Sequence, residues 1–113
     1  MILNSLNFNA VPFRTATVPA NELGEGAELK IREFTSLAKI QFSQKVQAQD
    51  VDFYDVDFQC YYLRNSLVTE DNKPLLKSDE EAKQFLGLVS IDLLTRLNEA
   101  ITKLNTPEQT LKN

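Results

Sequence analysis

The most regular pattern of hydrophobic positions lies in the middle of the chain. Apolar residues recur there at alternating spacings of three and four, at Phe53, Val56, Cys60, Leu63 and Leu67. Because this spacing places all of them on one face of a helix, it predicts an amphipathic helix from Phe53 to Leu67. Val56 to Tyr62 also alternates between apolar and polar residues, so a strand is the alternative interpretation of that part.

A polar turn is predicted where this pattern stops. Residues 69–74 read Thr-Glu-Asp-Asn-Lys-Pro. Asp and Asn favour turns, and Pro74 disfavours helix at the residue before it. Leu75 and Leu76 then return the chain to the core.

Two further helical patterns follow the turn. Ser78 or Asp79 is the expected N-cap of the first helix, and Gly87 is its expected end. Ser90 is the expected N-cap of the second. The expected apolar side is formed by Ala82, Phe85 and Leu86 in the first helix and by Leu93, Leu94, Leu97, Ala100, Ile101 and Leu104 in the second.

The first third of the chain has the pattern of a β-hairpin. Residues 13–18 are rich in β-branched side chains and lie between Pro12 and Pro19, which suits an edge strand. Gly24 and Gly26 permit a tight turn. Ala27, Leu29 and Ile31 then alternate with charged residues, as in a strand with one buried face.

Thr35 is the expected N-cap of a helix that runs to about Gln49. Ala38, Phe42 and Val46 are expected to line its buried side. Ile40 falls nearly opposite, where it is either an ordinary exposed aliphatic or a subunit contact.

Together these elements predict an α+β fold: a mainly α-helical, small single domain (1–113) with an N-terminal β-hairpin and about four helices. Residues 1–10 are expected to be a loose N-terminal arm and residues 106–113 a frayed C-terminal tail.

Composition argues against several functions. The 113 residues carry a net charge of −4, and Lys and Arg are scattered singly, so we expect no binding to nucleic acid. No apolar run approaches the roughly 20 residues that span a bilayer, so no membrane contact is expected. The single cysteine, Cys60, is expected to be a small buried hydrophobe of a protein in a reducing cytoplasm.

No catalytic or ligand-binding motif is recognisable. The chain has no histidine, no cysteine pair for zinc and no Gly-rich phosphate loop, so we expect no enzyme activity, no cofactor and no metal. Asp50, Asp52, Asp55 and Asp57 are best explained by the positive end of a helix dipole. A calcium loop would require a glycine that is missing here.

The function is therefore expected to depend on surfaces. Tyr54, Phe58 and Tyr61 form an aromatic flank of the central helix, which is either core or an interface, because tyrosine is a common interface anchor. The candidate partner-binding residues are Ile40, Tyr54 and Tyr61.

The order of elements from about Val18 to Leu104 resembles the tail assembly chaperones of long-tailed, siphophage-type bacteriophages and prophages. Three pieces carry this resemblance: Leu23-Gly24 followed by residues 29–35 (Leu-Lys-Ile-Arg-Glu-Phe-Thr), residues 63–76, and the two closing helices with Asp79-Glu80-Glu81 and residues 90–105. The family commonly has Asp-Gly in its acidic turn, where this chain has Asn72 at the Gly position. Asn tolerates left-handed geometry, so the turn should persist.

The resemblance implies a role in tail assembly. Such a protein binds and solubilises the tape measure protein, helps recruit tail tube protein subunits, and is expected to be a homo-oligomer. It would act in the cytoplasm of the bacterial host and be absent from the mature virion. In many such phages a ribosomal frameshift also yields an extended form, and the final Leu-Lys-Asn permits a slippery codon sequence.

Three alternatives remain open at this stage. One is a structural tail-completion or neck component retained in the virion. The second is a regulatory helix-turn-helix module, although the final helix has only Arg96 and Lys103 as basic residues. The third is an enzyme subunit or adaptor without a phage role.

Overall fold

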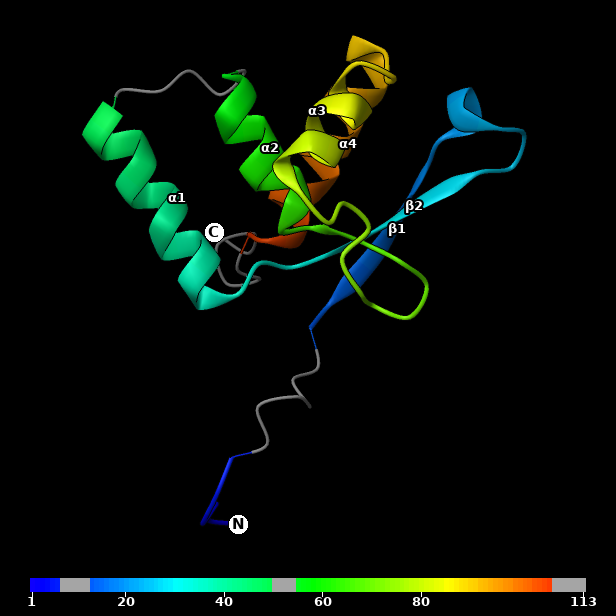
Figure 1. Cartoon of the computed structure of the whole chain (residues 1–113). Coiled ribbons are helices and arrows are strands. Elements are labelled where there is room, and N and C mark those ends of the chain that lie inside the picture. Colours follow the sequence, from blue (N-terminus) through cyan, green and yellow to red (C-terminus); the bar gives the residue numbers. More distant parts are fainter. Residues whose placement is uncertain (7–12, 50–54, 107–113) are drawn as a thin grey trace.

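The computed structural model describes residues 1–6, 13–49 and 55–106. Over these residues the chain forms a three-stranded antiparallel sheet and four α-helices (Figure 1). The predicted α+β, mainly helical fold is therefore confirmed. The predictions for Asp50, Asp52, Phe53 and Tyr54 lie outside the described residues, as do those for residues 7–10 of the arm and 107–113 of the tail.

The predicted hairpin forms two strands of the sheet. β1 (Thr15–Pro19) pairs antiparallel with β2 (Glu28–Arg32), and the strand order is β1–β2–β3, so β1 lies at an edge as expected. A 3-10 turn, η1 (Asn21–Leu23), begins the connection. Gly26 has a φ of 76°, a left-handed conformation that favours glycine.

The predicted N-caps of three helices are confirmed. Thr35 Oγ1 accepts a hydrogen bond from the amide of Ala38 at the start of α1 (Ser36–Gln49), 3.0 Å away. In α3 (Asp79–Leu86) and α4 (Ile91–Leu104) the caps are Ser78 and Ser90, each accepting from an amide in the first turn. These side chains satisfy amides that the helix itself leaves without partners.

The helix predicted from Phe53 to Leu67 is shorter than expected. The described helix is α2 (Val56–Arg64), and Asp55 caps it by accepting a hydrogen bond from the Phe58 amide at 3.1 Å. The strand interpretation of Val56 to Tyr62 is therefore wrong. Asp55 fulfils the predicted role of a carboxylate at the start of a helix.

A short third strand replaces the end of that predicted helix. β3 (Leu67–Val68) pairs antiparallel with β2, placing Leu67 opposite Ile31 and Val68 opposite Lys30. The open side of β2 offers backbone partners, and this tertiary pairing overrides the helical spacing of the sequence. In the turn that follows, Asn72 has a φ of 65°, so its predicted left-handed conformation is confirmed.

The buried face of α2 also differs from the predicted stripe. Val56 is 53% exposed, whereas the buried set is Phe58, Gln59, Cys60, Tyr62 and Leu63. α2 packs against α3, its Gln59 meets Asn98 of α4 at 3.2 Å, and its Phe58 meets the ring of Phe42 in α1. A helix that is packed against neighbours on several sides buries more than one face. The periodicity of hydrophobic residues in the sequence indicates only one such face.

The core lies between α4 and the sheet. α4 packs across β1 and β2. It contributes Leu93, Leu97 and Ile101, all of which are fully buried. The predicted stripe of α4 is therefore part of the described core, to which α2 also contributes Phe58, Cys60, Tyr62 and Leu63.

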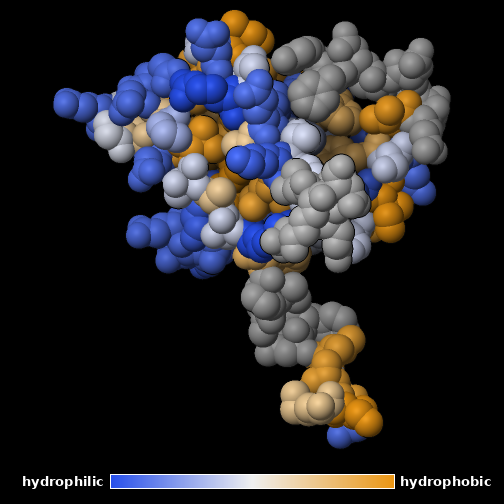
Figure 2. Space-filling model, turned by 180° about the vertical axis from the view of Figure 1, so that it is seen from behind, coloured by the Kyte–Doolittle hydropathy of each residue, from blue (hydrophilic) through white to orange (hydrophobic). Residues whose placement is uncertain are grey.

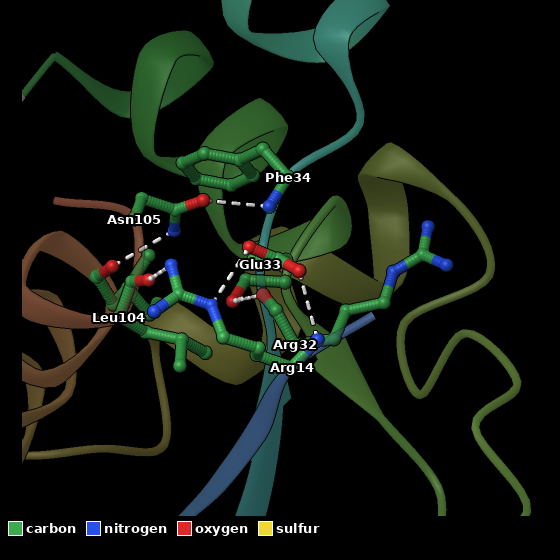
Figure 3. A network of polar contacts seen from close by, with 8 residues as sticks. Arg14, Arg32, Glu33, Phe34, Leu104 and Asn105 are labelled. Atoms are coloured by element: carbon green, nitrogen blue, oxygen red, sulfur yellow. Dashed lines mark hydrogen bonds and ion pairs between the residues drawn. The ribbon is translucent and has the colours of Figure 1, made fainter. Parts of the chain in front are cut away.

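A polar network joins the end of α4 to the strands (Figure 3). Glu33 accepts hydrogen bonds from the Arg14 backbone N–H and from Nε of Arg14, at 2.8 and 3.1 Å. Nη2 of Arg14 donates to the Leu104 carbonyl at 2.7 Å, and Oδ1 of Asn105 accepts from the Phe34 amide, also at 2.7 Å. This network fixes the segment from which α1 departs.

Candidate protein-binding surfaces

α1 stands to one side of the other helices and presents an uncharged outer face. Leu37 and Ile40 are 65% and 55% exposed, and Ser36, Ser43 and Gln44 are exposed near them on the same side of the helix. We call this set the α1 outer face. Figure 2 shows hydrophobic surface on the side of the molecule where α1 lies.

Among the side chains of α1 that the structure describes, two are buried, Ala38 and Phe42. The ring centroid of Phe42 lies 4.7 Å from that of Phe34 and 5.4 Å from that of Tyr62. Val46 was predicted to line the same buried side but is 43% exposed. The contact of α1 with the core is therefore concentrated near Phe42, and the helix continues beyond it.

Two of the predicted contact residues can be placed. Ile40 lies on the α1 outer face, as its position opposite the buried side predicted. Tyr61 is half-buried between α2 and α1: its hydroxyl donates to Oε1 of Gln41, and Nζ of Lys45 lies 5.3 Å from its ring. Tyr54 lies outside the described residues. Whether these residues bind a partner stays a prediction.

An aromatic cavity of about 310 Å³ opens beside α1. Phe34, Phe42, Phe58 and Tyr62 line it, together with the end of α4. Burial raises the pKa of the Tyr62 hydroxyl, although its hydrogen bond with Oγ1 of Thr102, at 2.8 Å, opposes that shift. Of the aromatic flank that the sequence left open between core and interface (Tyr54, Phe58 and Tyr61), Phe58 is core and Tyr61 is half-buried.

A second cavity, of about 610 Å³, is lined by basic side chains. Arg32 from β2, Arg64 from the end of α2, and Lys73 and Lys77 from the segment between β3 and α3 converge on it. We call it the basic groove. Sequence analysis missed it because these four residues are separated along the chain and become neighbours only in the fold.

Other exposed apolar side chains lie away from both surfaces. Met1, Ile2, Leu3 and Leu6 belong to the N-terminal segment, which projects from the fold in Figures 1 and 2. Leu88, which follows α3, and Ile91, the first residue of α4, are 70% and 64% exposed.

Two further expectations from the sequence concern metal ligands and membrane spans. No group of three or more metal-ligating side chains occurs within the described ranges. Likewise, no described helix is long and apolar enough to cross a membrane. Cys60 is buried, as predicted, and burial raises the pKa of its thiol.

The arrangement of the sheet, the hairpin and the four described helices is the fold of a bacteriophage tail assembly chaperone. The structure is similar to that of the tail assembly chaperone of bacteriophage HK97, with a TM-score of 0.59 and 21% sequence identity over 88% of each chain. No protein-family model matches the sequence, and no curated protein sequence is similar to it. The resemblance found in the sequence is therefore matched by the fold.

Proposed function

We propose that this protein is a non-catalytic tail assembly chaperone of a long-tailed bacteriophage or prophage. It binds the tape measure protein, keeps it soluble and helps recruit tail tube subunits. It acts in the cytoplasm of the bacterial host and does not remain in the virion. The observation that carries the proposal is the similarity to the HK97 chaperone over most of both chains.

The α1 outer face is the surface best suited to such a partner. A tape measure protein is a long helical chain, and its unpaired apolar stripes would aggregate in water. An exposed helix face with two large aliphatic side chains can pack against such a stripe. Leu37 and Ile40 lie one turn apart, so they can insert between neighbouring side chains of a partner helix.

The charge of α1 favours an acidic partner helix. α1 contains Lys39 and Lys45 and no acidic residue, whereas the whole chain has a net charge of −4. The first turn of a helix also carries partial positive charge, and Leu37 lies in that turn. α1 therefore offers an acidic partner a basic element of a chain whose net charge is negative.

Many weak contacts suit the proposed role better than one tight contact. The α1 outer face offers two large exposed aliphatic side chains, whereas a stable complex buries roughly 800 Å² per partner. Repeated copies along one long helix would gain affinity through avidity, and each copy could still leave when the tube forms. Association between copies on the partner fits the predicted homo-oligomer.

The test is co-expression of this chain with its neighbouring genes, among which we expect one for a long helical protein. We expect that protein to be soluble, and to co-purify, only when this chain is present. The variant Leu37→Glu/Ile40→Glu should fold normally and lose co-purification. The matched control, Leu88→Glu/Ile91→Glu, places the same charges on other exposed aliphatics and should retain it.

Two results would contradict the proposal. If the long protein is equally soluble without this chain, there is no chaperone activity. If mass spectrometry finds this chain in purified particles at the level of structural proteins, it is a tail-completion or neck component instead. If only the control variant loses binding, the partner contacts the region between the end of α3 and the start of α4 and not α1.

A further inference from the structure

We infer that the basic groove is a second binding site, which takes a carboxylate-rich peptide segment of a partner protein. Four of the twelve Lys and Arg residues of an acidic chain converge there, from β2, α2 and the segment before α3. This inference goes beyond the proposed chaperone function and does not depend on the α1 outer face.

The arginines of the groove have unused hydrogen-bonding capacity. Arg32 has no carboxylate partner within the described parts of the chain, and its guanidinium lies 5.0 Å from the ring centroid of Phe13. Nε of Arg32 and Nε of Arg64 are also buried without a hydrogen-bond acceptor among the described residues. A guanidinium has five donors in a planar fork that matches a carboxylate.

Internal acids neutralise the groove only in part. Nη1 of Arg64 contacts Oδ1 of Asp79 at 2.8 Å, and Nη2 donates to the Lys77 carbonyl at 3.2 Å. Glu81 accepts a hydrogen bond from the backbone amide of Lys77 at 3.1 Å. Lys73 and Lys77 are exposed, so their ammonium groups can meet a bound anion.

The shape of the groove favours a peptide over a nucleic acid. Its volume of about 610 Å³ suits a few side chains of a single segment. Tyr61, Pro74 and Leu76 also line it and offer apolar contact between the charges. A nucleic acid presents a continuous row of phosphates, which the remaining acidic surface of this chain would repel.

The test uses a short fluorescein-labelled peptide rich in Glu and Leu, with binding measured by fluorescence anisotropy. We expect binding that weakens as salt is raised, and no binding of the matching Gln peptide. Lys73→Gln/Lys77→Gln should weaken binding by about tenfold or more, because it removes two charge-assisted contacts. Lys83→Gln/Lys103→Gln removes the same charge from exposed positions outside the groove and outside α1, and should change affinity by less than about twofold.

Arg32→Gln serves as an independent variant and should also weaken binding, while circular dichroism checks that each variant folds. The inference is overturned if both lysine pairs weaken binding equally, since the attraction is then not local to the groove. It is also overturned if the peptide does not bind at low salt. Tighter binding of a labelled oligothymidylate would make the groove a phosphate-backbone site. None of these three results affects the co-expression test of the chaperone function.

Discussion

α1 and α4 have the same length, 14 residues, and nearly opposite relations to the core. α4 buries Leu93, Leu94, Leu97, Asn98 and Ile101. α1 buries Ala38 and Phe42 among its described side chains, although both helices begin with a side-chain N-cap. The end of α4 is also tied to the strands by Arg14 and Asn105, whereas α1 follows that network without joining it.

The difference shows that two helices of equal length can depend on the core to very different degrees. α4 is stabilised by tertiary packing, which is the main source of helix stability in proteins. α1 makes few such contacts, so it is only partly docked and keeps an exposed face. We therefore expect substitutions in α4 to unfold the molecule and substitutions in α1 to act locally.

The largest effect is expected for Leu97→Ala. Leu97 is fully buried in α4. Truncating such a leucine lowers the free energy of unfolding by about 2–5 kcal/mol, because apolar burial is lost and a cavity is left behind. Urea denaturation followed by circular dichroism measures this loss directly. A loss below about 1 kcal/mol would mean that α4 does not dominate the core.

A smaller and more local effect is expected for Phe42→Ala. Its ring contacts Phe34, Phe58, Tyr61 and Tyr62, so the change removes most of the attachment of α1. We expect a loss of about 2 kcal/mol, less than for an enclosed phenylalanine, because α1 can move aside. Hydrogen exchange should show faster exchange in α1 amides and little change in α4. Equal acceleration in both helices would remove the distinction drawn between them.

The smallest effect is expected for Glu33→Gln, and it depends on pH. The Arg14 backbone N–H, and then the Arg14 side chain, hold the pKa of Glu33 below its ordinary 4.5. A lowered folded pKa stabilises the fold above the unfolded pKa, and this contribution is lost as the pH falls through the folded value. Wild type should therefore lose stability below about pH 4.5, and E33Q should lose less over the same range.

Urea midpoints measured across that pH range test this expectation. Glu22, whose pKa is lowered by a backbone hydrogen bond and by Arg96, is present in both proteins and contributes to both curves. Hydrogen exchange of the backbone amides near the end of α4 should be the most sensitive to this change of pH, because Arg14 also donates a hydrogen bond to the Leu104 carbonyl. Identical pH profiles for the two proteins would show that the network does not contribute.

The features that the sequence predicted well depend on local chemistry. Thr35, Ser78 and Ser90 are caps because a hydroxyl reaches amides in the next turn, whatever the rest of the fold does. The backbone of Asn72 has a left-handed conformation because its turn requires a positive φ at that position. The alternation of Leu29 and Ile31 likewise fixed the buried face of β2.

The features that the sequence missed depend on contacts between distant segments. Leu67 fits the predicted helical stripe, but it pairs with the free edge of β2 and forms β3 together with Val68. Gln59 and Asn98 are buried polar residues, and Nδ2 of Asn98 in α4 donates to Oε1 of Gln59 in α2, whereas hydropathy alone would place both at the surface. The basic groove was missed for the same reason, since no run of basic residues marks it.

Because Cys60 is buried, the reactivity of its thiol can report how often the core opens. The thiol is 2% exposed, and its pKa is raised by burial and, to a smaller extent, by Asp79. A maleimide reagent needs both access and the thiolate, so it reacts only when α2 separates from its neighbours. The labelling rate of the purified, intact chain therefore reports openings of the core, because the chain has no other cysteine to react.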